Sequence, residues 1–385
     1  MTTANGSNPI REAPTASRPF RVLSLDGGGT RGVYTAAFLD HLLTQRAARS
    51  GCNPLDLGLG FDLVVGTSTG AIVGCAAAVG LPMADIVDLY RNHAPAIFPH
   101  RIKGLWSAIY RAATGGHYVR RGDLALKEAL DAVLGDVTMR DVFEQRGIAL
   151  AIPSVDMSTH KAWVFKKTTK SGVRDDLFRL ADVCLASSAA PIYRSLAAID
   201  VPGCSGPKKV FADGGLWANN PIMVGLTDAL ANAAPDQPIE IFSLGTCPRP
   251  EGEHIAGSKV HRSMLGWRLG ADVAPLSISA QEFAYDNMAR LIAIAMSGCG
   301  RSIRRVRFPN KPVPASMMEY LALDDAREEA MDRLVLQART DAEMTLSACD
   351  DPGNADGALI CALLGSLPEL DPQKTLNPVH SPKKV

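Results

Sequence analysis

DGGGTRG, residues 26–32, follows the apolar run RVLSL (21–25), and four of its seven residues are glycine. The run before it predicts a buried strand. The segment after it, residues 32–50, predicts a helix, because large apolar side chains recur every fourth residue from Tyr34 to Leu42. A glycine-rich turn between a strand and a helix lets backbone N–H groups approach an anion closely. The anion could be a nucleotide phosphate or the negative charge of a reaction intermediate.

The nucleotide interpretation rests on Gly27, Gly29 and Gly32, whose spacing matches the G-x-G-x-x-G pattern of dinucleotide-binding loops. That pattern also requires an acidic residue about 20 positions further on, at the end of the second strand, to hold a ribose. Residues 46–51 read RAARSG and contain no acid. The sequence therefore disfavours a nucleotide in this loop.

A second glycine turn, GTSTG (66–70), lies between the apolar run FDLVV and the small-residue helix predicted for AIVGCAAAVG. It matches G-x-S-x-G, in which a serine lies on a tight turn between a strand and a helix. Gly66 and Gly70 are needed because larger side chains would crowd the turn on either side of Ser68. The turn exposes the Ser68 hydroxyl beside a helix N-terminus, which favours an anion there. Ser68 is therefore the candidate nucleophile.

A nucleophilic serine needs a proton acceptor, which is usually a histidine oriented by an acid. None of the eight histidines lies in a strand-plus-glycine turn, and the nearest candidate, His254, lies in a polar connecting stretch. Asp213 is better placed, because it ends the strand predicted for KKVFA and precedes Gly214 and Gly215. Active sites of parallel α/β sheets assemble at strand ends. Asp213 is therefore the candidate base, although an aspartate before two glycines is also typical of an ordinary turn.

Alternating strands and helices up to residue 250 predict an α/β fold with a parallel sheet. Further strands are expected at IALAIPSVD (148–156), KAWVFKK (161–167) and IEIFSLGT (239–246). A helix is expected within 177–193, ending before Pro191. Beyond residue 250 the pattern changes to long helical stretches, notably 271–297 and 314–347, and one strand-like piece, SIRRVRF (302–308), interrupts them.

The three motifs DGGGTRG, GTSTG and DGG together resemble those of the patatin-like phospholipases. That family uses a Ser–Asp dyad in place of a triad, forms its oxyanion hole from the glycine-rich loop, and carries its acid in DG(A/G). The resemblance implies Ser68 as nucleophile, Asp213 as general base, and no metal or cofactor. It also implies roles for the glycine-rich loop and the motif glycines: an oxyanion hole from the N–H groups of Gly27, Gly28 and Gly29 with Arg31 in support, and structural roles for Gly32, Gly66, Gly70, Gly214 and Gly215.

The resemblance covers roughly residues 20–345. ASSAAPIY (186–193) resembles the small-residue segment before the family's substrate pocket, and DGGLWANNP (213–221) extends the acid motif. Thr30 departs from the family, which often has an aliphatic residue there. The fold implied is α/β and patatin-like, with a mostly parallel central sheet, helices on both faces and a helix-rich C-terminal elaboration.

The expected organisation is a single catalytic domain with additions at both ends. A flexible leader (1–19) precedes a patatin-like catalytic core (20–250). A helical elaboration of the same domain (251–345) is followed by a partly disordered tail (346–385).

The composition excludes several functional classes. Forty Lys and Arg balance forty Asp and Glu, so no overall charge attracts a nucleic acid polymer. No segment reaches the roughly 18–20 apolar residues of a membrane span, and the polar N-terminus does not resemble a signal peptide. The eight cysteines include no CxxC pair, which disfavours a disulfide framework or zinc site. We therefore expect a cytoplasmic protein that acts at the membrane surface.

The predicted activity is that of a lipid acyl hydrolase of the phospholipase A type, which cleaves membrane phospholipids through an acyl-enzyme. Two alternatives stay open: a hydrolase of soluble esters with a Ser-His-Asp triad, and a non-catalytic lipid-binding platform. The resemblance extends to bacterial antiphage effectors that cyclic nucleotides activate, and it permits a homo-oligomer. Arginines of the strand-like piece could pair with the activator's phosphates, although a solvent-facing strand is the favoured interpretation: Arg301, Arg304, Arg305 and Arg307.

Overall fold

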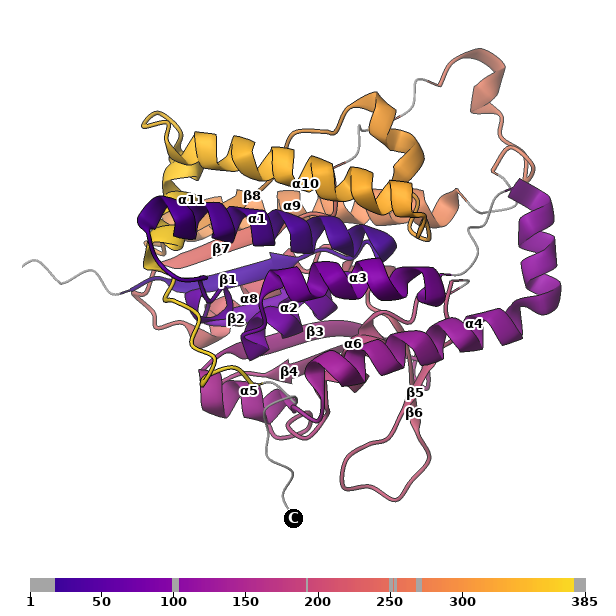
Figure 1. Cartoon of the computed structure of the whole chain (residues 1–385), viewed down its shortest axis with the longest axis horizontal. Helices are drawn as coiled ribbons and strands as arrows, with labels where there is room; N and C mark the ends of the chain where they lie inside the picture. Colours follow the sequence, from indigo (N-terminus) through magenta and orange to yellow (C-terminus); the bar gives the residue numbers. More distant parts are fainter. Residues whose placement is uncertain are drawn as a thin grey trace, which may run out of the picture.

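The structure is a computed structural model, and it describes residues 18–98, 104–191, 193–248, 252, 255–267 and 272–376. A single sheet lies at its centre, with the strand order β5-β6-β3-β2-β1-β7-β8 and with β4 paired to β3 (Figure 1). The leader expected over 1–19 lies outside the described residues apart from Arg18 and Pro19. The part of the expected tail beyond residue 376 also lies outside them.

The strands predicted from the sequence all occur. They are β1 (Phe20–Leu25), β2 (Leu63–Gly66), β3 (Ala149–Asp156), β4 (Lys161–Lys167), β6 (Lys209–Asp213), β7 (Ile239–Leu244) and β8 (Ile303–Arg307), to which the structure adds the short β5 (Ala197–Ile199). The pairs β1–β2, β1–β7, β2–β3 and β7–β8 are parallel, whereas β4 and β6 run antiparallel to β3. The expected mostly parallel α/β fold is confirmed.

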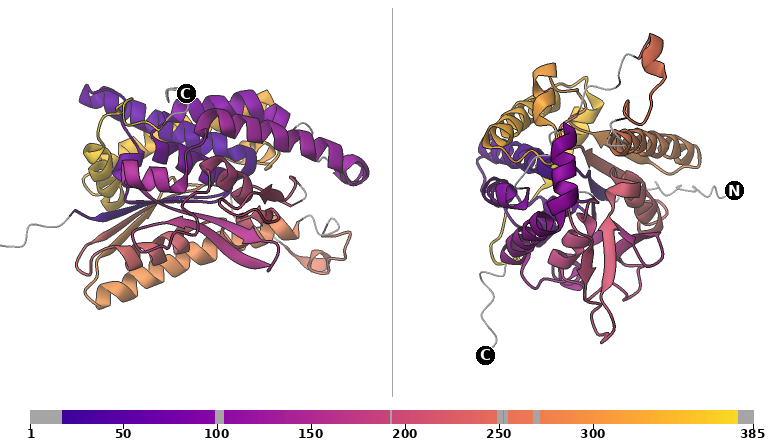
Figure 2. Two further views of the ribbon diagram at one scale, coloured as in Figure 1. Left: turned by 90° about the horizontal axis from the view of Figure 1, so that it is seen from below. Right: turned by 90° about the vertical axis from the view of Figure 1, so that its right-hand side faces the viewer.

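Helices cover both faces of the sheet (Figure 2). They are α1 (Gly32–Ser50), α2 (Thr69–Val79), α3 (Met83–Ile97), α4 (Gly104–Leu134), α5 (Met139–Arg146), α6 (Leu180–Ser187), α7 (Gly215–Ala218), α8 (Ile222–Asn232), α9 (Val273–Gly298), α10 (Glu328–Cys349) and α11 (Ala355–Ser366). The helix expected at 177–193 ends at Ser187, and the second long helix is shorter than expected because a 3-10 turn precedes it. None of the helices in the described ranges combines the length and hydrophobicity that a membrane crossing requires.

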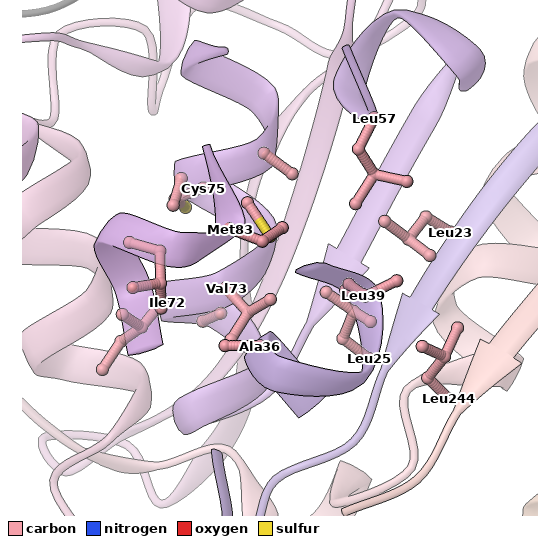
Figure 3. Close-up of a cluster of buried hydrophobic side chains, with 14 of the residues drawn as sticks. Leu23, Leu25, Ala36, Leu39, Leu57, Ile72, Val73, Cys75, Met83 and Leu244 are labelled. Carbon is pink, nitrogen blue, oxygen red and sulfur yellow. The ribbon is translucent and has the colours of Figure 1, made fainter. Parts of the chain in front are cut away.

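Alternation along β1 divides the core into two layers. Leu23 and Leu25 face α1 and α2, where they pack with Leu39 and Val73 (Figure 3). Val22 points to the opposite face, into the cluster that includes side chains of α8 and α9. A strand buried on both faces reads as a continuous apolar run, which is why RVLSL was recognisable as a parallel strand.

The residues after 250 contribute directly to this architecture. β8 extends the sheet beyond β7, and α10 lies along α1, where the Tyr34 hydroxyl donates to an Asp341 carboxylate oxygen at 2.6 Å. The chain continues through α11 to Leu376, whose N–H donates to the Val79 carbonyl at 2.9 Å. These contacts place the C-terminal elaboration, and the described part of the expected tail up to residue 376, against the sheet and its helices.

Candidate active site

Two strands end beside β3, and their ends point toward each other. β2 pairs in parallel with residues 149–151 of β3, and β6 pairs antiparallel with residues 154–156. β4 occupies the opposite edge of β3 along nearly its whole length, so β2 and β6 follow one another on the same edge. The gap between their ends receives Ser68 from one side and Asp213 from the other.

The direction of the strand that carries Asp213 differs from the one expected. The sequence predicts that β6 ends at the same edge of the sheet as the parallel strands. Because β6 runs antiparallel to β3, it enters from that edge, and Asp213 stops opposite Ser154. The carboxylate is therefore set inward from the edge.

The turn after β2 holds Ser68 in a strained backbone conformation. Ser68 has φ 55° and ψ −119°, a region that non-glycine residues rarely adopt, so its surroundings must impose it. Its N–H donates to Ser187 Oγ at 2.9 Å, and Ser187 Oγ donates in turn to the Pro153 carbonyl at 2.7 Å. A side chain at Gly66 would collide with the Gly70 backbone, and one at Gly70 with the backbone of β1. These contacts explain both motif glycines.

Ser68 and Asp213 form a hydrogen bond, with 2.8 Å between Ser68 Oγ and Asp213 Oδ2. Both residues are buried, with 7% and 5% of their surfaces exposed. The other carboxylate oxygen of Asp213 accepts from the Gly215 N–H at 2.6 Å. Burial raises the pKa of Asp213 to about 6, against the opposing effects of the Gly215 and Ser68 hydrogen bonds and the positive charge of Arg194. A carboxylate with this pKa can accept a proton near neutral pH.

The positive charge of Arg194 acts on Asp213 and lowers its pKa. Its guanidinium is buried and forms an ion pair with Asp123 at 2.8 Å. Burial lowers the pKa of Arg194, which the Asp123 and Asp213 carboxylates oppose. Asp123 belongs to α4, so this helix fixes a positive charge beside the dyad.

The glycine-rich loop presents a smaller set of donors than the sequence suggested. The Gly27 N–H already donates to the Asn219 carbonyl at 2.9 Å. The Gly27 carbonyl accepts from Thr246 Oγ1 and Asn219 Nδ2, both at 3.1 Å. Within the part of the chain that the structure describes, the N–H groups of Gly28 and Gly29 have no hydrogen-bond acceptor. Gly28 and Gly29 therefore hold the donors that remain for an oxyanion.

Close packing explains why these positions are glycine. A Cβ at Gly28 would collide with the side chain of Thr246. Gly29 has φ 59°, and a Cβ there would collide with the Leu323 carbonyl. Arg31 Nε donates to the Gly28 carbonyl at 3.3 Å, so Arg31 braces the loop from within.

The remaining motif glycines also lie at close approaches. A Cβ at Gly32 would meet the Tyr90 hydroxyl, and one at Gly214 would meet the Pro153 carbonyl. At Gly215 an added Cβ would lie 3.0 Å from Asp213 Oδ1. Gly214 and Gly215 thus let the backbone approach groups that hold the dyad, whereas Gly32 makes room for the Tyr90 side chain.

The first residue of the loop, Asp26, pairs with an arginine from the far end of the chain. Asp26 is buried, and Arg307 on β8 donates to its Oδ2 and to Ser243 Oγ. Asp26 Oδ1 has no hydrogen-bond partner among the described residues. Burial raises the pKa of Asp26, and the Arg307 guanidinium opposes that shift. The charge of Arg307 is therefore what allows Asp26 to ionise at the base of the loop.

The other two arginines of β8, and Arg301 just before it, also have partners. Arg304 pairs with Glu240, and Arg305 pairs with Asp286 at 2.7 Å. Arg301 donates to the Ala233 carbonyl at 3.4 Å. Each of these side chains thus has a partner within the protein, although Arg301 Nε and Arg305 Nε have none among the described residues. A phosphate that binds Arg304 or Arg305 would have to compete with a carboxylate.

Several residues of the site were not singled out from the sequence. Ser187, Asn219 and Thr246 contact Ser68 or the glycine-rich loop, and Arg194 acts on Asp213 through its charge. Ser187 and Asn219 lie inside ASSAAPIY and DGGLWANNP, so those motifs carried a signal for them. Arg307 is a phosphate candidate in the sequence, but its pairing with Asp26 has no sequence signal, because it depends on strand pairing across the sheet.

Among the histidines whose side chains the structure describes, none contacts Ser68 or Asp213. His41 pairs with Glu343 at 2.6 Å, and His93, His160 and His261 are exposed. His254, the nearest candidate for a triad, lies outside the described residues.

Comparison with known proteins gives a consistent result. The family model described as "Patatin-like phospholipase" matches residues 23–226, which include the glycine-rich loop, GTSTG and Asp213. A protein of Vibrio cholerae named "cGAMP-activated phospholipase" is 28% identical over 83% of this chain and 89% of its own length. One of the same name from Pseudomonas aeruginosa is 31% identical over 70% of this chain and 74% of its own. An Escherichia coli protein named "cUMP-AMP-activated phospholipase" is 31% identical over 60% of this chain and 66% of its own.

Proposed function

The chain belongs to the patatin-like phospholipase family, and from that premise we propose that it cleaves the acyl esters of membrane phospholipids with Ser68 and Asp213. The observation that carries the proposal is the 2.8 Å hydrogen bond between Ser68 Oγ and Asp213 Oδ2 at a strained, buried turn. Backbone strain of this kind costs about 1–3 kcal/mol and persists at sites where it serves the mechanism. An ordinary structural serine would not need it.

The first half of the reaction forms an acyl-enzyme. Ser68 Oγ attacks the ester carbonyl carbon while Asp213 Oδ2 takes its proton, and the N–H groups of Gly28 and Gly29 donate to the resulting oxyanion. The tetrahedral intermediate collapses, the ester C–O bond breaks, and the departing lysophospholipid oxygen takes the proton from Asp213. One well-placed oxyanion donor is typically worth about 10²–10³ in rate.

The second half returns the enzyme to its starting state. Asp213 takes a proton from a water molecule, the hydroxide attacks the acyl carbon, and the same donors hold the second oxyanion. The bond to Ser68 Oγ then breaks, Ser68 recovers the proton, and a fatty acid leaves. The Gly215 N–H keeps the second Asp213 oxygen fixed, so that Oδ2 faces the serine throughout.

We also propose that a cyclic nucleotide activates the enzyme, which would suit a role as a bacterial antiphage effector. The support is that relatives covering most of this chain carry names with such activators, cGAMP in two cases and cUMP-AMP in a third. Because the named nucleotides differ, family membership alone does not select one. A ligand can activate only by binding the active state more tightly than the inactive state.

A pocket beside Arg307 is the favoured position for such an activator. Its volume is about 480 Å³, within the usual range for small-molecule sites, and its lining includes Arg290, Arg305 and Arg307. Asp286 also lines it and pairs with Arg305, so a phosphate group there would compete with a carboxylate. Arg307 contacts Asp26 at the head of the catalytic loop, which gives the pocket a direct connection to the site.

The test combines a chromogenic ester with lipid mass spectrometry of vesicles. The wild type should hydrolyse both substrates and release fatty acid and lysophospholipid, and Ser68→Ala should do neither. A panel of cyclic di- and trinucleotides should raise the rate for at least one member, and Arg290→Ala should weaken that response without lowering the unstimulated rate. Full activity that no nucleotide changes would contradict the activation proposal alone.

The triad alternative needs its own control. His254→Ala and His261→Ala should retain turnover in a folded protein, because the proposed base is a carboxylate. Loss of turnover in either variant would show that a histidine takes the proton and would overturn the dyad.

A further inference from the structure

Exposed apolar side chains concentrate in one part of the surface. Among the described residues, ten of the 18 large hydrophobic side chains that are strongly exposed lie between residues 255 and 294. Isolated exposed leucines are ordinary, whereas a contiguous group marks an interaction surface. The position of these residues on the surface therefore decides whether they form an interaction surface.

Helix α9 carries a continuous apolar stripe on its outer side. Leu276, Phe283 and Ile294 are spaced by seven and eleven residues, which brings them to the same side of a helix with 3.6 residues per turn. They are 55%, 66% and 59% exposed. The side that faces the protein uses the small residues Ala289 and Ala293, which are buried. Tyr285, Ile292 and Met296 also pack partly against the core on that side, whereas Leu276, Phe283 and Ile294 are exposed.

The N-terminal half of α9 lies next to the dyad. Because α9 connects two parallel strands, β7 and β8, it begins at the edge where the strands end (Figure 2). Gln281 accepts from the Asn219 N–H at 2.8 Å, and Glu282 accepts from the Asn219 side chain. Asn219 in turn contacts Gly27, so Leu276 and Phe283 flank residues that hold the catalytic loop.

Other exposed apolar residues surround the same edge. Leu216 is 55% exposed and lies in α7, three residues after Asp213. The segment 255–267 precedes α9 and lies at the same end of the molecule in both Figure 1 and Figure 2. We call the combined set the apolar rim: Leu216, Ile255, Val260, Met264, Leu265, Val273, Leu276 and Phe283.

The charge of segment 255–267 complements an anionic membrane. It contains no Asp or Glu, and it carries Lys259, His261 and Arg262. The Arg262 guanidinium lies 5.1 Å from the centre of the Trp267 ring. Basic and aromatic residues beside apolar ones are typical of segments that lie at the interface of a bilayer.

We propose that the apolar rim docks into the surface of a bilayer containing anionic phospholipid and so brings the acyl esters to Ser68. The proposal rests on the proposed function, since a phospholipid substrate must leave its bilayer partway to reach a buried serine. The stripe continues along α9 to Met288, Leu291 and Ile294, which lie beyond the rim. That continuation supplies a matched control on the same helix.

The experiment compares two double variants. Val273→Ser/Leu276→Ser removes two rim side chains that are 51% and 55% exposed, and Leu291→Ser/Ile294→Ser removes two that are 50% and 59% exposed. In both pairs the two residues are three positions apart. The second pair lies 18 residues further along α9, which is about 27 Å at a rise of ~1.5 Å per residue. The binding assay is flotation with phosphatidylcholine vesicles, with and without phosphatidylglycerol, in the background of Ser68→Ala. Each mixture is run with and without cGAMP.

The rim pair should lower vesicle binding about 25-fold, because each inserted side chain contributes about fivefold. In the active protein, turnover of vesicle lipid should fall by the same factor, while turnover of a soluble short-chain ester should stay within twofold. The distal pair should bind vesicles like the wild type, and phosphatidylglycerol should strengthen binding at low salt.

Three results would overturn the proposal. One is a wild type that binds vesicles in neither condition, and another is an equal loss of binding in the two pairs. The third is a change of oligomeric state in the rim pair by light scattering, which would make this face a contact between copies of the chain. Because binding is measured without Ser68, failure of the catalytic proposal would appear separately, as absent ester turnover with binding intact.

Discussion

The raised pKa of Asp213 predicts how the rate depends on pH. The proposed base must be ionised to accept the Ser68 proton, so kcat/KM should fall as pH falls through about 6, the pKa that burial gives this carboxyl. At pH 5 about a tenth of the enzyme would carry an ionised base, so the rate should be about a tenth of its plateau. An ordinary aspartate, with a pKa of about 3.9, would leave about nine-tenths of the rate.

Unfolding cannot imitate this loss through Asp213 itself. A carboxyl whose folded pKa is raised binds its proton more tightly in the folded state, so its contribution to stability declines as pH rises from about 4 to 6 and is fully present below that range. The assay is the initial rate with a soluble chromogenic ester between pH 4 and 9, with circular dichroism at each pH to confirm the fold. A temperature series adds a second criterion, because carboxyl ionisation depends little on temperature whereas imidazole ionisation depends on it strongly.

Arg194 provides the internal control for the assignment. Its positive charge lowers the pKa of Asp213, so Arg194→Met should move the acidic limb of the profile to higher pH, and Arg194→Lys should move it back. A wild-type limb near pH 4 would refute the reasoning. So would a limb that shifts markedly on warming, or one that Arg194→Met leaves in place.

Other predictions concern the nucleophile, the loop and its support. Ser68→Ala should abolish turnover and covalent labelling by a fluorophosphonate while leaving the thermal midpoint no lower than that of the wild type; labelling at another serine would contradict it. Arg307→Met leaves the buried Asp26, whose pKa burial raises to about 7, without its counter-charge. At pH 8 it should lower the free energy of unfolding by about 3 kcal/mol in urea, the low end for a broken buried pair because Arg307 is a quarter exposed, and at pH 6 by less, because Asp26 is then protonated. Adding Asp26→Asn should recover most of that loss, and purely additive effects would show that the two do not interact. Gly28→Ala, whose Cβ collides with Thr246, should lower kcat at least tenfold with little change in KM, and the reverse pattern would indicate a substrate-binding loop.

The sequence was sufficient wherever the structure follows local rules. The strand β1, the helix α1 and the turn at Ser68 were predictable because burial on both faces, helical periodicity and the steric needs of a tight turn each leave a mark on consecutive residues. Asp213 was predicted as a site residue, but the direction of its strand was not, because the pairing of β6 with β3 is a long-range choice. The antiparallel register, rather than a shared carboxyl edge, is what sets Asp213 opposite Ser68.

The sequence also does not show which N–H groups of the glycine-rich loop are free to bind an oxyanion. Three consecutive glycines are indistinguishable as oxyanion donors in the sequence, yet the Asn219 carbonyl occupies one of them. Likewise, the three arginines in SIRRVRF resemble a phosphate site until their partners on β7, α9 and the catalytic loop are known. Which of several equivalent groups is already satisfied depends on contacts between distant segments, and composition alone does not determine it.

The bond between Arg307 and Asp26 joins residues 281 positions apart, and it has a consequence for the protein during its synthesis. Thr30, in the same loop, also depends on late residues, since its N–H donates to the Leu323 carbonyl at 2.9 Å. A nascent chain that has emerged as far as Asp213 already contains both members of the dyad but neither of these supports. The ribosome must deliver roughly another hundred residues before the loop can be fixed in place. The catalytic loop would thus stay unsupported while the protein is being made, because β8 supplies the partner of a residue that directly follows β1.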